Sequence, residues 1–313
     1  MATSRPIRLI LDYDSTLTVD DTMAILADLP KQPKMTWQEI VDAYMRDYQI
    51  HKEAPFQWKN YDRAEYSRWL ASRKSVEQKS AQRVQDAGFF KCVTHEDVDR
   101  AIRKSLDNGS LELRSGWVDV FDWALSLPDH GQNDNASSRS ISILSVNWSG
   151  TAIRSALLQS AESLENYPRR ENICQYISDM EILANEIEGL YEPGGSSGRV
   201  CGVEGPDIRT SDDKLAQLRR GSCDGTTPFV IYVGDSSTDF DCLCEADLGV
   251  WLCNVPPTEY GKVFRETFKP FAGFVPPPLS SLPRLGACEK SLFYWAPNFE
   301  TLLKLLAQQQ ASN

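Results

Sequence analysis

The chain has 313 residues, of which 41% are hydrophobic, 10% aromatic and 25% charged, and this composition excludes a mainly disordered protein. Its 33 basic and 44 acidic residues give a net charge of −11, so we expect neither a nucleic acid nor a membrane partner. The eight cysteines lack zinc-ligand spacing and are accompanied by three histidines, so we interpret them as reduced thiols of a cytoplasmic protein.

Runs of branched apolar residues predict the strands of a parallel sheet, because strands buried on both faces read as continuous apolar runs. In chain order these runs are Ile7–Leu11, Ser140–Ser145, a weaker one near Met180–Ala184, Phe229–Val233 and Leu248–Leu252. Helical periodicity is found between the runs at Thr151–Leu164, Asp212–Arg220 and Asp239–Ala246. This alternation predicts an α/β fold with a doubly wound, mainly parallel sheet.

A segment of different character follows the first strand. It is rich in Lys, Arg, Glu, Gln and Ala, has tryptophans and tyrosines interleaved, and shows no strong strand pattern. We therefore predict an inserted all-helical cap at residues 21–113 and a core domain made of residues 1–20 and 114–313. Basic residues with aromatics can bind nucleic acid, but packing between helices explains them as well and is favoured. Residues 128–139, 194–205 and 276–283 predict loops, and residues 293–306 predict an aromatic cluster followed by a closing helix.

Polar residues lie at or near the carboxyl ends of the predicted strands, where an open α/β sheet places its functional crevice. One more, a lysine, lies near the start of a predicted helix. In chain order they are Asp12, Asp14, Thr16, Ser145, Asn147, Lys214, Asp235 and Asp239. Each has an ordinary structural explanation, such as a turn or a helix cap, but the whole set in this order indicates a catalytic site.

The chemistry that this set can perform is phosphoryl transfer. Asp12 and Asp235 together make an oxygen-rich site suited to Mg²⁺. A carboxylate can attack phosphorus and form an aspartyl phosphate, and Asp14 can protonate the leaving alkoxide and later deprotonate water. Lys214 and the Ser145 hydroxyl would neutralise charge on the phosphoryl oxygens.

The sequence resembles phosphatases of the haloacid dehalogenase (HAD) superfamily. DYDSTLT at 12–18, LSVNW at 144–148, Lys214 and GDSSTD at 234–239 are similar to the four motifs of that superfamily. The resemblance implies that Asp12 is the nucleophile and Asp14 the general acid and base, with Ser145 and Lys214 holding the phosphoryl group.

The resemblance also implies a metal site and a cap. Asp12, the main-chain carbonyl of Asp14, and Asp235 would hold Mg²⁺, with Asp239 and Thr16 in supporting roles. The helical segment between the first and second motifs corresponds to a cap of the C1 type. A dehalogenase is disfavoured, because that branch lacks the second aspartate of the first motif.

Two groups within the superfamily are the most similar. DYDSTLTVDDTMAILADL and ILANEIEGL resemble phosphoserine phosphatases. SVNWSGTAIRSAL and IYVGDSSTDFDCLCEADLGV resemble the HAD domain of plant and related fungal thiamine monophosphate phosphatases. Ser15 stands where the superfamily usually has glycine, and Asp21 stands where phosphoserine enzymes place a substrate-binding glutamate.

Asp21 and Asn147 are the candidate substrate contacts. An acidic residue at the cap hinge would favour a leaving group that carries positive charge. The alternative for Asp21 is a cap on the helix that begins near Thr22.

We therefore expect a Mg²⁺-dependent phosphomonoester hydrolase that forms an aspartyl phosphate and acts on a small phosphorylated metabolite. Thiamine monophosphate is the first candidate substrate. A phosphoserine-like amino-phosphate phosphatase and a catalytically inactive HAD-fold protein that senses a ligand remain as alternatives.

Overall fold

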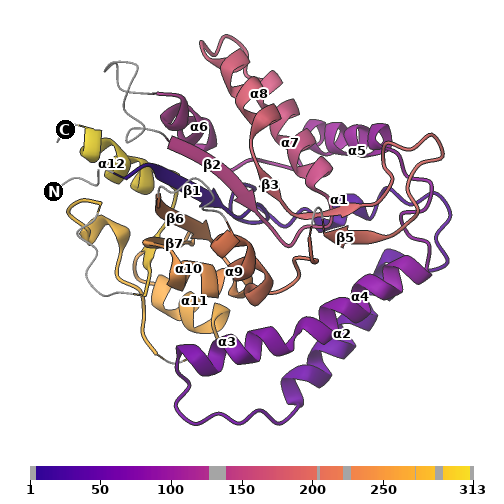
Figure 1. Ribbon diagram of the computed structural model, residues 1–313, viewed down its shortest axis with the longest axis horizontal. Helices are drawn as coiled ribbons and strands as arrows, with labels where there is room; N and C mark the ends of the chain where they lie inside the picture. The colour runs from indigo at the N-terminus through magenta and orange to yellow at the C-terminus, as the bar shows by residue number, and fades with distance from the viewer. Residues whose placement is uncertain are drawn as a thin grey trace.

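A six-stranded parallel sheet with the strand order β3-β2-β1-β6-β7-β8 lies at the centre of the molecule (Figure 1). The computed structural model describes residues 5–126, 139–202, 205–220, 227–271, 273–285 and 292–310. The strands are Ile7–Leu11 (β1), Arg139–Leu144 (β2), Ile182–Leu183 (β3), Phe229–Gly234 (β6), Leu248–Leu252 (β7) and Tyr294–Ala296 (β8). A separate antiparallel pair consists of Asn185–Ile187 (β4) and Val200–Gly202 (β5). The predicted α/β fold is confirmed.

The two faces of the sheet bury two hydrophobic clusters, because successive residues of a strand point to opposite faces. In β1, Leu9 and Leu11 belong to the first cluster, whereas Ile10 between them belongs to the second. Helices that contribute to the first cluster are His95–Asp107 (α5), Trp117–Leu125 (α6), Gly150–Glu162 (α7), Arg170–Asp179 (α8) and Phe299–Gln310 (α12). Helices that pack on the second are Arg63–Ser72 (α3), Ser211–Arg220 (α9), Phe240–Glu245 (α10) and Tyr260–Thr267 (α11). Burial on both faces explains why the strands read as continuous apolar runs.

The regular elements between β1 and α6 are all helices, joined by turns and loops. Before α5 this segment contains Met23–Leu26 (α1), Trp37–Glu53 (α2), Arg63–Ser72 (α3) and Lys74–Asp86 (α4). Helix α5 packs against α7, whereas α2 and α4 lie side by side at a distance from the sheet (Figure 1). Helix α3 packs against α9. We call α2, α3 and α4 the cap helices; the division of the chain at residues 21 and 113 stays a prediction.

Local sequence explains where two of these helices begin. Thr36 before α2 and Thr94 before α5 each accept a hydrogen bond from the backbone N–H three residues later. The side chains of Glu39 and Asp97 in turn accept from the two threonine N–H groups, which completes a capping box in both cases.

The chain leaves and re-enters the core through two segments that pair with each other. The Val19 N–H donates to the Glu112 carbonyl at 2.9 Å, and the Arg114 N–H donates to the Leu17 carbonyl at 2.7 Å. This pairing places Arg114 directly beside the loop that follows β1.

Sequence analysis missed several short elements. Tyr294–Ala296 is the edge strand β8, where the sequence predicts only an aromatic cluster. The predicted loop at 194–205 contains β5, and the one at 276–283 contains a 3₁₀ turn at Leu279–Ser281. The predicted loop at 128–139 lies outside the described residues, apart from Arg139 at the start of β2.

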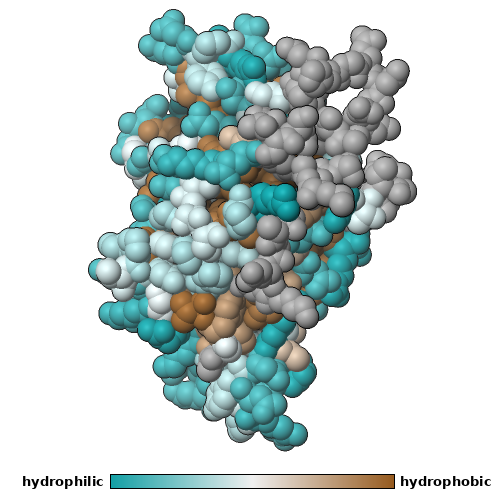
Figure 2. Space-filling view, turned by 90° about the vertical axis from the view of Figure 1, so that its left-hand side faces the viewer, coloured by the Kyte–Doolittle hydropathy of each residue, from teal (hydrophilic) through white to brown (hydrophobic). Residues whose placement is uncertain are grey.

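Hydrophilic residues cover most of the face shown in Figure 2, and hydrophobic residues reach the surface there in smaller areas. Across the described parts of the chain, every helix is too short or too polar to span a lipid bilayer.

Candidate active site

The candidate site lies at the carboxyl ends of the three central strands. The register pairs Leu11 of β1 with Ile143 of β2 on one side and with Val233 of β6 on the other. The residues that follow these strands therefore meet at one edge of the sheet, and the chain continues to both sides of β1. Such a switch in strand order opens a crevice in α/β proteins, and Asp12 and Asp235 both lie in it.

Lys214 lies between two carboxylates and is fully buried. Its Nζ is 2.9 Å from Asp12 Oδ1 and 2.7 Å from Asp239 Oδ1. Burial alone would lower the pKa of Lys214, but the charges of Asp12 and Asp239 outweigh burial and raise it. The side chain is therefore a fixed ammonium group beside the predicted nucleophile.

Asp239 is engaged through both of its carboxylate oxygens. Besides Lys214, its Oδ1 accepts a hydrogen bond from the Tyr232 hydroxyl at 2.7 Å. Its Oδ2 accepts from the Ser236 N–H at 3.0 Å and from the Ser236 hydroxyl at 3.1 Å. A Cβ atom on Gly234 would lie 2.4 Å from Asp239 Cγ, so glycine is required where β6 ends. Asp239 thus anchors Lys214, and its supporting role in catalysis or metal binding stays a prediction.

Asp12, Asp235 and Asp239 form a cluster whose carboxylate oxygens lie within 4.8 Å of one another. Together with Lys214 these three groups carry a net charge of −2 when ionised. Burial, and then the charge of Asp239, raises the pKa of Asp235 to about 7, and burial raises that of Asp12 as well. The hydroxyl of Thr16 donates to Asp235 Oδ1 at 3.0 Å and favours the charged form.

This cluster fits Mg²⁺, which prefers a few carboxylate oxygens and a partly open site. Within the described residues, Oδ2 of Asp12 and Oδ2 of Asp235 accept no hydrogen bond. The main-chain carbonyl of Asp14 likewise accepts none from the described backbone. Asp239 is the least suited of the three to bind a cation directly, because its oxygens already have protein partners.

Asp14 faces Thr22, just before α1, and Asn147, just after β2. Its Oδ1 accepts from the Thr22 N–H at 2.8 Å and from the Thr22 hydroxyl at 2.5 Å, and its Oδ2 accepts from the Asn147 side-chain amide at 2.8 Å. Asn147 also donates its backbone N–H to Ser145 Oγ at 3.1 Å. Ser145 and Asn147 are both buried. Asn147 therefore lies beside the predicted acid and base, and its contact with a substrate stays a prediction, as does that of Ser145 with a phosphoryl group.

Two residues that sequence analysis did not single out shape the site. The Arg114 guanidinium donates to the carbonyls of Ser15 at 2.6 Å and Thr16 at 2.9 Å, across almost 100 positions of sequence. The indole N–H of Trp251 donates to the Asp235 carbonyl at 2.8 Å. A tryptophan in a buried strand needs a partner for its N–H, which is the one signal that could have drawn attention to Trp251.

The turn after β1 explains a departure from the superfamily pattern. Ser15 has a φ of 56°, in the left-handed region that glycine adopts at no steric cost. The position therefore suits the glycine usual there, and serine occupies it with modest strain. Its N–H donates to the Thr18 hydroxyl at 3.0 Å, which holds the turn.

A cavity of about 270 Å³ lies between the cap helices and the core. Trp37 and Tyr44 of α2 line it together with Asp21 and Trp148. Asp21 Oδ1 also accepts from the Met23 N–H at 2.8 Å, at the start of α1. Desolvation, and then the charge of Asp14, raises the pKa of Asp21. Both interpretations of Asp21, as a helix cap and as a cavity wall, thus agree with its position.

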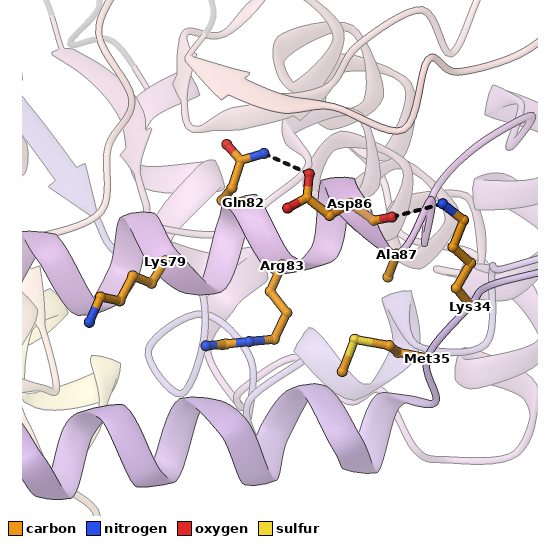
Figure 3. Close-up of a pocket in the computed structure, with 7 residues that line it drawn as sticks. All are labelled: Lys34, Met35, Lys79, Gln82, Arg83, Asp86 and Ala87. Carbon is orange, nitrogen blue, oxygen red and sulfur yellow. Dashed lines mark hydrogen bonds between the residues drawn. The ribbon is translucent and has the colours of Figure 1, made fainter.

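A second cavity, of about 470 Å³, lies on the cap itself (Figure 3). It is lined by residues of α4 and of the segment before α2, among them Lys34, Lys79 and Arg83. Its described lining includes none of the predicted site residues.

No protein-family model matches the chain. A CTO1 family protein of Schizosaccharomyces pombe is 27% identical over 239 residues, which cover 75% of this chain and 77% of that protein. The bifunctional TH2 protein of Arabidopsis thaliana, named as mitochondrial, is 27% identical over 292 residues. That match covers 84% of this chain but 42% of the TH2 protein, so the chain spans less than half of that relative.

Among solved structures, cytosolic 5′-nucleotidase IIIB bound to cytidine superposes with a TM-score of 0.51 at 14% identity. The match covers 100% of this chain and 89% of the nucleotidase. At this identity the likeness concerns the fold alone. The chain thus shares its α/β fold with this nucleotidase.

Proposed function

We propose that this protein is a phosphomonoester hydrolase that requires Mg²⁺ and acts through an aspartyl-phosphate intermediate. One observation carries the proposal: Asp12 lies beside the buried Lys214 and within reach of Asp235, at the switch point of the sheet. The four-motif resemblance to HAD phosphatases and the fold shared with the 5′-nucleotidase support it.

In the proposed first step, one oxygen of the Asp12 carboxylate attacks phosphorus, and Lys214 and the Tyr13 N–H, 2.9 Å and 2.8 Å from Oδ1, fix the orientation of the carboxylate. A bond forms between this oxygen and phosphorus while the bond from phosphorus to the leaving oxygen breaks. Lys214 supplies a fixed positive charge close to the phosphoryl oxygens.

Asp14 would act as general acid and then as general base. Its carboxyl proton passes to the leaving oxygen, so the alcohol departs neutral. The resulting carboxylate then takes a proton from the water that attacks the aspartyl phosphate, which releases phosphate and restores Asp12. Thr22 and Asn147 fix the orientation of Asp14 through the hydrogen bonds described above.

Asp12, Asp235 and the Asp14 carbonyl would hold Mg²⁺, which when bound neutralises charge on the phosphoryl group. Thr16 and Arg114 support these ligands from the protein side, Thr16 through its bond to Asp235 and Arg114 through the loop carbonyls.

We propose a small phosphate ester as substrate, because the cavity between cap helices and core has a volume of about 270 Å³. Thiamine monophosphate is the first substrate to test, given the sequence resemblance and the aromatic walls formed by Trp37, Tyr44 and Trp148. Phosphoserine is the second, because Asp21 on the cavity wall could face an ammonium group.

The decisive experiment is hydrolysis of p-nitrophenyl phosphate by the purified protein with Mg²⁺ and with excess chelator. We expect turnover that needs Mg²⁺, followed by a preference within a panel that contains thiamine monophosphate and phosphoserine. Absence of hydrolysis for every phosphate ester, in a protein that still binds Mg²⁺, would favour an inactive ligand-binding protein instead.

A further inference from the structure

Arg73 connects α3 to α4 and reaches from the cap helices to the core. Its backbone is itself helical, with φ −68° and ψ −14°, so the two helices meet at this residue without a loop. Its Nη1 donates to the Ser237 hydroxyl at 3.2 Å. Ser237 lies in the loop from Asp235 to Asp239, which ends in the 3₁₀ turn Ser237–Asp239, so Arg73 contacts the loop that carries two of the three clustered carboxylates.

The guanidinium of Arg73 is held in place from the cap side. Its Cζ lies 4.9 Å from the ring centroid of Tyr48, and its Nη2 is 3.7 Å from Glu77 Oε1. The Tyr44 hydroxyl donates to the same Glu77 oxygen at 2.9 Å. Burial alone would lower the pKa of Arg73, but Tyr48, Tyr44 and Glu77 together raise it, so the residue stays charged. Arg73 also lines the cavity of about 270 Å³.

The next residue makes a second connection between cap helices and core. Lys74 Nζ lies 2.5 Å from Oδ1 of Asp213, the residue directly before Lys214. Asp213 Oδ2 in turn accepts from the Thr210 N–H and hydroxyl at the start of α9. The junction of α3 and α4 therefore contacts both elements that supply the charged groups beside Asp12.

Helix α3 is fixed to the same region by packing. Tyr66 meets Phe240 of α10 edge-on, with 4.6 Å between ring centroids, and Ser67 hydrogen-bonds Asp241. These contacts seat the junction on the core, so Arg73 keeps its position relative to Ser237.

At the opposite end of α4, Arg83 provides a natural comparison. Figure 3 shows it pointing from α4 toward the facing helix. Its Nη2 lies 2.6 Å from Oδ2 of Asp47 on α2. Arg83 thus makes an ion pair of similar partial burial that stays within the cap helices.

We propose that Arg73 is a positioning residue that fixes the loop from Asp235 to Asp239 through Ser237 and thereby couples the cap cavity to metal binding. The proposal rests on the proposed function for the identity of the metal, Mg²⁺. Because Arg73 touches both the cavity and the loop, a ligand in the cavity and Mg²⁺ at Asp235 should each strengthen the binding of the other.

The test compares Mg²⁺ binding by calorimetry in the whole protein and in Arg73→Gln, Arg73→Lys, Ser237→Ala and Arg83→Gln. We expect the Mg²⁺ dissociation constant to rise about tenfold in Arg73→Gln and in Ser237→Ala, the scale seen when a group supporting a metal ligand is lost. Arg73→Lys should recover part of the loss. Arg83→Gln should stay within about twofold of wild type, because it breaks only a contact between α2 and α4.

An activity measurement separates positioning from catalysis. The Arg73→Gln protein should hydrolyse p-nitrophenyl phosphate slowly at low Mg²⁺ and approach the wild-type kcat when Mg²⁺ is saturating. A kcat that stays low at saturating Mg²⁺, or an unchanged Mg²⁺ dissociation constant, overturns the proposal. Should Arg73→Gln fail to fold, Ser237→Ala decides the same question from the core side.

The proposed function can fail independently of this inference. If wild type binds Mg²⁺ but hydrolyses no phosphate ester, the binding comparison between the Arg73 and Arg83 variants still decides the role of Arg73. If wild type binds no Mg²⁺, the coupling proposed for Arg73 is wrong as well.

Discussion

The ammonium nitrogen of Lys214 lies 2.9 Å from Oδ1 of Asp12, and both side chains are buried. One oxygen of the proposed nucleophile is thus fixed by a charge, while the other has no hydrogen-bond partner among the described residues. The same ammonium group is 2.7 Å from Asp239, so a single lysine serves two carboxylates. Lys214 therefore orients Asp12 and also neutralises buried negative charge, so its loss should affect both activity and stability.

Replacing the nucleophile should abolish turnover. Asp12→Asn keeps the shape of the side chain but removes the negative oxygen that would attack phosphorus. We expect activity on p-nitrophenyl phosphate to fall by at least about a thousandfold, the scale of losing a covalent catalyst. Steady-state assays at saturating Mg²⁺ measure this, and a variant that keeps a tenth of wild-type turnover would show that Asp12 is not the nucleophile.

Replacing Lys214 should cost stability as well as activity. Lys214→Gln leaves the buried carboxylates of Asp12 and Asp239 without their counter-charge, and breaking a buried pair in this way costs about 3–5 kcal/mol. We expect denaturant unfolding without Mg²⁺ to show a loss of that order, and added Mg²⁺ to recover part of it.

An exposed ion pair on α12 serves as the control for Lys214. Lys304 Nζ lies 2.7 Å from Glu300 Oε1, with both side chains largely in solvent. Lys304→Gln should change the free energy of unfolding by less than about 0.5 kcal/mol. Equal effects of the two substitutions would mean that Lys214 is not an electrostatic anchor.

Much of the sheet could be predicted from the sequence because its strands are buried on both faces. The runs at Ile7–Leu11 and Leu248–Leu252 coincide with β1 and β7, and the run at Phe229–Val233 falls one residue short of β6. The edge strand Tyr294–Ala296 was missed because three residues are too few for a pattern. Helix Arg170–Asp179 was also missed, since its buried face has only Ile173 and Ile177 and gives too short an apolar pattern.

The sequence predicted Asp12 and Asp235, which follow neighbouring strands, but not Arg73 and Arg114, which come from parts of the chain far away in sequence. Asp12 and Asp235 meet because their strands are neighbours in the sheet, which the strand pattern implies. Arg73 and Arg114 reach the site through long-range contacts, over 164 positions from Arg73 to Ser237. No sequence pattern near either arginine predicts these contacts, because they depend on how distant segments of the chain pack together.

Mg²⁺ binding should weaken in acid because of Asp235. Burial and the charge of Asp239 raise its pKa to about 7, and a carboxyl group must lose its proton to bind the metal. The Mg²⁺ concentration for half-maximal rate should therefore be roughly tenfold higher at pH 6 than at pH 8. Rate measurements across Mg²⁺ concentrations at both pH values test this, and an unchanged Mg²⁺ requirement would contradict a raised pKa at Asp235.

Protonation of Asp235 should also make the free energy of unfolding depend on pH when Mg²⁺ is absent. Between the ordinary pKa of 3.8 and the folded value of about 7, the folded protein keeps a proton on Asp235 that the unfolded chain has lost. Unfolding then releases a proton, so the contribution of Asp235 to stability falls as pH rises through this window. Asp235→Asn, which does not titrate, should remove this contribution and flatten the pH dependence of unfolding.

Asn147 should affect the acid and base rather than the metal. Asn147→Ala removes the amide that donates to Asp14 Oδ2 at 2.8 Å, so Asp14 keeps only its contacts with Thr22. We expect kcat on p-nitrophenyl phosphate to fall about tenfold, the low end of general acid and base effects, with the Mg²⁺ requirement unchanged. A higher KM at an unchanged kcat would instead support Asn147 as a substrate contact.

Asp21 decides whether the cavity discriminates by charge. Its carboxylate lies on the cavity wall and is partly desolvated there, so replacing its charge should matter most for a substrate whose leaving group is cationic. Asp21→Asn should lower kcat/KM for thiamine monophosphate or phosphoserine by roughly tenfold and leave p-nitrophenyl phosphate nearly unaffected. Asparagine caps a helix about as well as aspartate, so the bond to the Met23 N–H can persist.

Asp20→Asn is the matched control, because it removes the same charge one residue away, at a position that does not line the cavity. If Asp21→Asn lowers kcat/KM equally for all substrates, Asp21 serves the start of α1 and not substrate selection. If Asp20→Asn and Asp21→Asn change kcat/KM equally, the overall charge of this segment matters rather than contact with the leaving group.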